Sequence, residues 1–171
     1  MKKCIIIAIL FIYSVNIILS QSPKIQLQNT IGTASDDYLY TIQQTADGGY
    51  FLGGHSGITG TNDDMWPTKL LANGSVNWQD HLGGTLDDWL YSIEQTSDNG
   101  YILGGLSYSG ISGEKTEANI GSNDYWIVKL KDDHTIDWQN TIGGSLDESL
   151  RDIHQTSDGG YIIGWKRELL I

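Results

Sequence analysis

The sequence is poor in cysteine, proline and basic residues. Its 171 residues include one Cys and two Pro, and ten Lys or Arg stand against 21 Asp or Glu, for a net charge of −11. A single cysteine cannot form an intramolecular disulfide, so packing must stabilise the fold. The acidic balance argues against nucleic acid and anionic membrane surfaces as partners, and it leaves cations, cationic groups and neutral glycans open.

Hydrophobic runs are short, and the longest lies at the start of the chain. Lys2 and Lys3 precede an apolar stretch from Cys4 to about Val15, and Ser20 closes the segment. The stretch falls short of the roughly 20 apolar residues that a membrane helix needs, and the pattern is typical of a secretory signal peptide. We therefore predict a signal peptide over residues 1–20 and a mature chain over 21–171 that is secreted, extracellular or periplasmic, without a membrane span.

The chain instead contains an internal repeat. The strings QTADGGY at 44–50, QTSDNGY at 95–101 and QTSDGGY at 155–161 each lie in a block of thirty residues that aligns without a gap. The repeat units span about 27–77, 78–137 and 138–171, and the last unit is truncated. A period of this size indicates a solenoid, a propeller or an array, in which each unit packs on its neighbours.

Each complete unit reads as four short strands separated by turn signals, without a helical pattern. The heptapeptide lies between the first two strands, where Asp-Gly-Gly or Asp-Asn-Gly suits a hairpin that needs positive φ. Asp47, Asp98 and Asp158 could instead bind calcium, although one or two oxygens per turn are few for that ion. Asn73-Gly74 marks the turn between strands three and four, and its counterpart, Asp133-His134, predicts a longer or more strained turn.

These patterns predict an all-β fold, namely an incomplete β-propeller of about 2.5 to 3 four-stranded blades after the signal peptide. Strands one and two carry apolar residues on both faces, so neighbouring blades should cover both. The Gly pairs at 53–54 and 104–105 would allow close approach of backbones. Four tryptophans would fill the space between blades: Trp66, Trp78, Trp126 and Trp138. Pro67 removes a backbone donor from the third strand.

The repeat pattern W-Q-x-x-[IL]-G-G-x-x-D-[DE]-x-x-x-x-I-x-Q-T-x-D-G-G-Y, followed by D-Y-W-I-V-K-L, resembles a family of secreted bacterial β-propeller-like repeat proteins over about residues 25–164. The resemblance implies a propeller architecture and, in longer members, a C-terminal sorting domain of the type IX secretion pathway. Family members are mostly of unassigned function, and some are labelled glucanases or lectin-like proteins. The resemblance therefore indicates the architecture more specifically than the activity.

Both ends of the repeat region depart from this family pattern. We expect one strand near the start of the first unit, then four, four and two strands, which is fewer than a closed propeller of four to eight blades requires. The tail KRELLI at 166–171 matches no earlier part of the repeat, and it suggests a truncated gene product. Unpaired edges predict self-association, pairing with other propeller blades, or instability.

Catalysis finds little support in the sequence. Glycoside hydrolysis needs two carboxylates in unlike environments, whereas the acidic pairs recur at equivalent places in each unit. The four His residues fall at different repeat positions, which argues against a zinc site. We predict no catalytic residues and a secreted or cell-surface binding or adhesion module. The alternative is a fragment of a carbohydrate-active, glucanase-like or glycan-binding protein.

The candidate binding face is formed by the loops that join strand two to three and blade to blade. The second unit carries a nine-residue insertion in its segment 107–123, which is either a specificity loop or a solvated insertion. Trp89 could be core or a sugar platform, and the carboxylates could cap backbone N–H groups or bind calcium, the one cofactor considered. A glycan or a surface protein would be the ligand. The candidate residues are Asp36, Asp37, Asp63, Asp64, Asp87, Asp88, Trp89, Tyr108, Asp124, Asp147 and Glu148.

Overall fold

The computed structural model describes residues 27–57, 62–148 and 150–165, and these residues form ten β-strands and no helix. The all-β prediction is confirmed. The predicted signal peptide and the tail at 166–171 lie outside the described residues. The strand expected near the start of the first unit is not present in residues 27–36, which hold no regular secondary structure.

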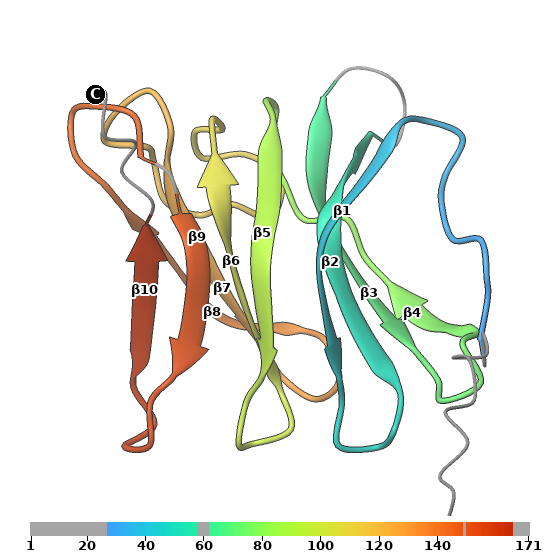
Figure 1. Cartoon of the computed structure of the whole chain (residues 1–171). Helices are drawn as coiled ribbons and strands as arrows, with labels where there is room; N and C mark the ends of the chain where they lie inside the picture. Colours follow the sequence, from blue (N-terminus) through green and yellow to red (C-terminus); the bar gives the residue numbers. More distant parts are fainter. Residues whose placement is uncertain (1–26, 58–61, 149, 166–171) are drawn as a thin grey trace, which may run out of the picture.

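The strands form three antiparallel sheets in which each strand pairs with the next along the chain (Figure 1). The first sheet contains β1 (Asp37–Gln44), β2 (Tyr50–Gly57), β3 (Asp63–Leu70) and β4 (Val76–Gln79). The second contains β5 (Asp88–Gln95), β6 (Tyr101–Ser107), β7 (Asp124–Leu130) and β8 (Ile136–Ile142). The third contains β9 (Leu150–Gln155) and β10 (Tyr161–Trp165). Each sheet corresponds to one sequence repeat, and the described strands close no barrel.

The sheets pack side by side, with their first strands β1, β5 and β9 next to one another (Figure 1). The larger core lies between the first two sheets, where Phe51 and Met65 meet Leu90 and Trp126. A smaller core joins the second sheet to the third through Ile102, Leu150 and Ile153. Strand β6 is buried on both faces, as expected, whereas β1 is largely exposed because no sheet covers its outer side.

The repeated heptapeptides form the hairpins β1–β2, β5–β6 and β9–β10. Gly48, Asn99 and Gly159 take φ angles of 79°, 65° and 87° there, so the turn prediction is confirmed. The aspartate of each turn accepts hydrogen bonds from the preceding threonine hydroxyl and from the backbone N–H two residues on. This short aspartate side chain closes the turn.

The turn between strands three and four has the same length in both complete units. Leu71 N–H donates to Ser75 O and Lys131 N–H to Thr135 O, each at 2.9 Å. His134 takes a φ of 58° where Gly74 has 81°. The expected lengthening is therefore wrong, and the expected strain is present, since positive φ is unfavourable for a residue with a Cβ.

Pro67 shortens the pairing between β3 and β4. The continuous ladder there joins only Thr68–Leu70 to β4, whereas β7 pairs with β8 from Tyr125 to Leu130. Beyond the proline, one isolated bridge joins Met65 to Leu82. The missing N–H accounts for the shorter fourth strand of the first sheet.

Candidate functional site

The end of β2, the start of β3, the loop that joins β6 to β7 and the described connections from one sheet to the next lie on one face of the molecule, opposite the heptapeptide hairpins (Figure 1). We call this the loop face. Asp63 N–H donates to Asp87 Oδ1 at 3.1 Å, and Tyr108 N–H donates to Asp87 O at 3.0 Å. Residues from two units therefore meet here, as the loop geometry predicted.

The second acid of each pair caps its own loop. Asp37, Asp88 and Glu148 each accept a hydrogen bond from the backbone N–H four residues earlier, at 2.7, 2.7 and 3.0 Å. Asp124 plays a similar part by accepting from Ile120 N–H at 2.5 Å. The capping interpretation is correct for these four carboxylates.

Two acid pairs form between neighbouring units. In the first, burial and the nearby Asp88 raise the pKa of Asp64 to about 6, and burial also raises the pKa of Asp88. In the second, burial raises the pKa of Glu148, with a contribution from Asp124. Each pair favours a retained proton, because two carboxylates in a partly buried site repel each other when both are ionised.

Of the remaining acids, Asp63 and Asp87 lie side by side, joined by the hydrogen bond from Asp63 N–H to Asp87 Oδ1. Asp36 and Asp147 are exposed in the loops that precede β1 and β9. Among the described residues, no three His, Cys, Asp or Glu side chains lie close enough to hold a metal ion. The loop face therefore brings acids of neighbouring units together in pairs, and nothing in the structure tests the calcium hypothesis.

Aromatic rings gather around His55 beside the acids. The buried imidazole lies 4.8 Å from the Tyr38 ring, 5.3 Å from Tyr40 and 5.4 Å from Trp89, between centroids. Tyr108, from the insertion, meets Trp89 edge-on at 5.6 Å. We define Tyr38, Tyr40, His55, Trp89, Tyr91 and Tyr108 as the aromatic row.

The aromatic row extends across the three first strands at their β-bulges. Tyr40, Tyr91 and Arg151 each occupy the residue that the register skips in β1, β5 and β9. The Tyr40 and Tyr91 rings lie 5.1 Å apart, and the Arg151 guanidinium lies 5.1 Å from the Tyr91 centroid. A bulge turns one side chain out of the regular alternation, so the repeated bulge aligns these three groups.

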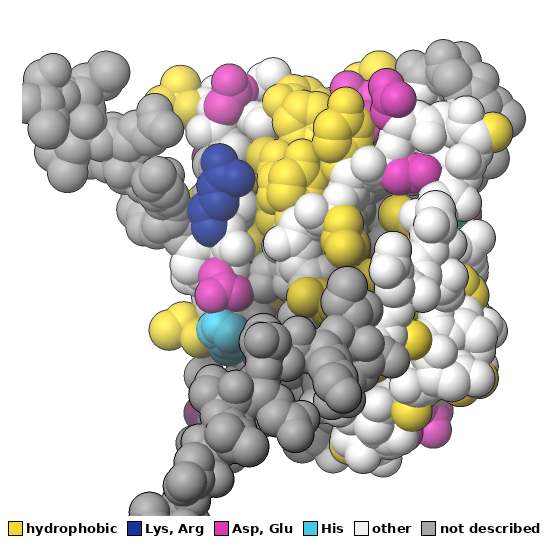
Figure 2. Space-filling model, turned by 45° about the vertical axis from the view of Figure 1, so that its right-hand side comes forward, with side chains coloured by type: hydrophobic (Ala, Val, Ile, Leu, Met, Phe, Trp, Pro, Cys, Tyr) yellow, Lys and Arg dark blue, Asp and Glu magenta, His cyan; other side chains and the backbone are white. Residues whose placement is uncertain are grey.

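The imidazole of His55 lies beside carboxylates of the loop face. Burial lowers the pKa of His55, against the opposing effects of Asp63 and Asp87. His55 Nε2 lies 3.6 Å from Asp63 Oδ2. Tyr38 and Tyr40 are about half exposed. Figure 2 shows a band of hydrophobic side chains on this side of the molecule, with acidic groups near its upper end.

Sequence analysis found only part of this row. Trp89, Tyr108 and the nearby Asp63 and Asp87 were among the candidates. Tyr40, His55, Tyr91 and Arg151 were missed. The structure places His55 against the candidate Trp89, and Tyr40, Tyr91 and Arg151 follow from His55 in successive contacts. The equivalence of positions 40, 91 and 151 in the repeat alignment was the available signal.

The insertion at 107–123 is fixed to the second sheet at several points, although many of its residues are exposed. Lys115 is buried, and its ammonium donates to Glu117 O at 2.6 Å and to Thr141 Oγ1 at 2.7 Å. Gln139 Nε2 donates to Glu114 O at 2.7 Å. The loop is thus anchored at a few buried residues and exposed elsewhere, so the choice between a specificity loop and a solvated insertion stays open; Tyr108, at its start, contacts Trp89.

A groove lies at the hairpin end, between the first two sheets. It is a polar groove of about 540 Å³ whose lining includes Asp47, Asn77, Trp78, Tyr101 and His134. The Trp78 and His134 rings stack at 4.8 Å. This groove lies on the face opposite the predicted one.

Comparison of the sequence with protein-family models and with curated proteins finds no match, so neither comparison tests the resemblance to propeller repeat proteins. Within the described ranges, no helix is long and apolar enough to span a membrane.

Proposed function

We propose that this protein is a non-catalytic glycan-binding module, secreted or displayed at the cell surface, and that the aromatic row is its binding site. One observation carries the proposal: the half-exposed Tyr38 and Tyr40 and the half-buried Trp89 surround His55, with Asp63 and Asp87 at their edge. Rings with polar tips offer an apolar face to sugar C–H groups, and carboxylates accept hydrogen bonds from sugar hydroxyls.

The proposed architecture is a sector of a β-propeller. Three antiparallel sheets, each with strands in sequential order and with their first strands adjacent, are what neighbouring blades provide. The proposed site would then face the axis of the ring, since it lies on first strands. Export rests on the predicted signal peptide at residues 1–20.

Glycoside hydrolysis is the second candidate, because one observation favours it. The pKa of Asp64 is raised to about 6, chiefly by burial, with contributions from the neighbouring Asp88 and Asp63. An acid that keeps its proton near neutral pH is what a general acid requires. The hydrolase would need Asp64 to reach a glycosidic oxygen.

A glycan array followed by calorimetry with the best glycan tests the binding proposal. We expect Trp89→Ala and Tyr40→Ala to weaken binding about tenfold or more, and Trp78→Ala, in the groove at the hairpin end, to leave it unchanged. Tyr40 is half exposed, so Tyr40→Ala should fold and still report on binding even if Trp89→Ala fails to fold. Binding lost only in Trp78→Ala would place the site in the groove, and no binding to any glycan would reject the proposal.

A reducing-sugar assay on the same glycans separates the two candidates. The binding module releases no sugar above a buffer blank. Release that disappears in Asp64→Asn would instead establish the hydrolase.

A further inference from the structure

The three units expose or bury equivalent residues according to whether a sheet precedes them. Leu90 and Leu150 are 0 % exposed, whereas the equivalent Leu39 is 51 % exposed. Ile93 and Ile153 are 6 % and 0 % exposed, whereas Ile42 is 62 % exposed. The outer side of the first sheet is therefore a copy of a surface that is buried in the other two sheets. A cavity of about 240 Å³ lined in part by Leu39, Leu52 and Trp66 opens on this side.

The opposite end of the stack carries the complementary surface. Phe51 and Ile102 are 0 % exposed because the next sheet covers them, whereas the equivalent Ile162 is 60 % exposed. Two glycines complete the internal contacts. A Cβ on Gly53 would lie 2.7 Å from Ile93 Cγ2, and one on Gly104 would lie 2.9 Å from Ile153 Cγ2.

The equivalent glycine at the open end is Gly164. The nearest atom that a Cβ there would meet is Asp152 Cβ at 3.5 Å, on its own hairpin. Ile42 is thus a projecting side chain at one end of the molecule, and Gly164 offers the matching recess at the other.

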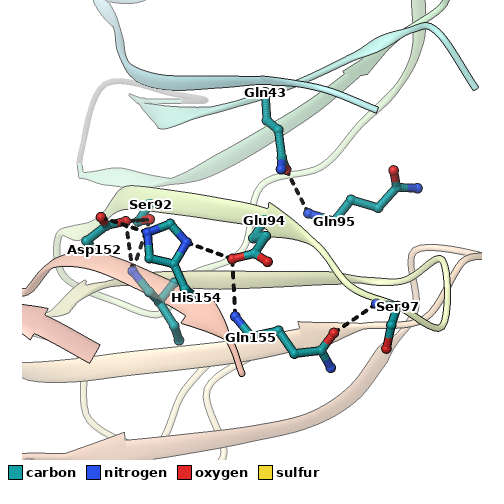
Figure 3. A network of polar contacts seen from close by, with 9 residues as sticks. Gln43, Ser92, Glu94, Gln95, Ser97, Asp152, His154 and Gln155 are labelled. Carbon is teal, nitrogen blue, oxygen red and sulfur yellow. Dashed lines mark hydrogen bonds and ion pairs between the residues drawn. The ribbon is translucent and has the colours of Figure 1, made fainter. Parts of the chain in front are cut away.

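Equivalent polar groups also form hydrogen bonds wherever one sheet packs on the next (Figure 3). Gln95 N–H donates to Gln43 Oε1 at 2.8 Å, and Gln155 N–H donates to Glu94 Oε2 at 3.1 Å. In return, Gln95 Oε1 accepts from Ala46 N–H at 2.8 Å, and Gln155 Oε1 accepts from Ser97 N–H at 2.9 Å. The corresponding groups at the two open ends are Gln44 and Ser157, and both residues are exposed.

We propose that the outer side of the first sheet binds the open side of the third sheet of a second copy of this chain. Ile42 and Leu39 pack on Gly164 and Ile162 of the other copy, and Gln44 Oε1 accepts from its Ser157 N–H. The contact repeats the apolar packing of the two internal ones and the hydrogen bond to the glutamine Oε1. It lacks their other polar contact, because His154 stands where Gln43 and Glu94 accept, and it joins unlike surfaces. Such head-to-tail contacts close into rings when the rotation permits. Two copies supply six sheets, which is within the range of closed propellers. Glycan binding is not required for this assembly.

Light scattering coupled to gel filtration tests the assembly with Ile42→Asp, Ile162→Asp and their equimolar mixture. We expect a wild-type dimer and monomers for each variant alone. The mixture should dimerise, because one contact then joins two unaltered surfaces. The dissociation constant of this mixed dimer should be about tenfold or more larger than that of the wild-type dimer, since its other contact carries both aspartates. Ile111→Asp, which alters another exposed isoleucine, should leave the dimer intact.

Both end residues are exposed within one copy, so the variants should fold, and circular dichroism checks this. A monomeric wild type overturns the proposal. So does a dimer of Ile162→Asp alone, because that result would join two first sheets. Failure of the mixture to associate has the same consequence. Each of these results leaves the glycan array free to support or reject the binding site.

Discussion

The ammonium of Lys69 lies 2.9 Å from Asp47 Oδ2, and Lys129 lies at the same distance from Asp98 Oδ2. Both lysines are buried, and both aspartates belong to the repeated heptapeptide. Hydrogen bonds from Thr96 and Lys129 hold the pKa of Asp98 at about 2, against the effect of burial, and similar bonds hold that of Asp47 well below its usual range. The repeated aspartate therefore closes a turn and neutralises a buried cation of its own sheet.

Replacement of Asp47 by Asn should destabilise the protein by about 1–2 kcal/mol, because it leaves the buried Lys69 ammonium without its charge partner. Asp158→Asn is the matched control, since the described contacts of Asp158 lie within its turn. Urea denaturation should show a clearly smaller loss for the control. Equal losses would mean that the turn, rather than the ion pair, requires the carboxylate.

Gly159→Val isolates the backbone requirement of the turn. Gly159 has a φ of 87°, and no atom lies within 4 Å of a Cβ placed there, so the variant suffers strain without a steric clash. We expect a loss of about 1–2 kcal/mol. Gly110→Val also has open space around the new side chain and needs no positive φ, and its melting temperature should stay near that of wild type. A similar loss in both variants would contradict the turn argument.

The sequence predicted the strands and turns well, because local patterns set them. The heptapeptide of the first unit, QTADGGY, predicts its own hairpin, and the alternation of turn signals predicts four strands per unit. Local patterns do not explain why glycine is required at the second glycine position of this heptapeptide. A Cβ on Gly49 would lie 2.2 Å from Leu70 O, on β3. That contact depends on how the first three strands pair.

The candidate site was harder to predict because its residues come from different units. His55, Trp89 and Tyr108 meet only when two sheets pack and the insertion folds onto them. The bulges that align Tyr40 with Tyr91 are features of strand register, which alternating hydrophobicity does not specify. The acids were easier to find because they recur, and their capping role follows from their fixed distance to the loop N–H groups.

The predicted signal peptide is tested on the exported protein. N-terminal sequencing should begin near Gln21, since the charged start, the short apolar stretch and Ser20 match an exported chain. Detection of Lys2 or Cys4 on the secreted protein would contradict this prediction.

Calcium should have little effect on stability, because several loop-face carboxylates already cap backbone N–H groups. The melting temperatures with and without millimolar calcium should differ by less than about 1 °C, which for a domain of this size corresponds to well under 1 kcal/mol of stability. A rise of several degrees in wild type that disappears in the double variant Asp87→Asn, Asp88→Asn would establish a calcium site instead.

The raised pKa of Asp64 predicts how stability varies with pH. Its pKa is about 6 in the folded protein against an ordinary value of 3.8, chiefly because of burial and the neighbouring Asp88. The folded state therefore binds this proton more tightly than the unfolded state does. The resulting stabilisation is fully present below pH 3.8 and is lost as the pH rises through about 6.

Asp64→Asn should isolate this contribution, because the amide resembles the protonated acid and does not titrate. We expect the variant to match wild type near pH 4 and to exceed it by about 1–2 kcal/mol at pH 7, a figure that discounts the shift for solvent at a partly exposed group. Asp36→Asn, which removes an exposed carboxylate of the same face, is the control for the loss of one negative charge. Urea denaturation at pH 4, 5, 6 and 7 measures both differences. A constant difference for Asp64→Asn would show that folding does not raise the pKa of Asp64, and a proton-sharing pair with Asp88 would then be excluded.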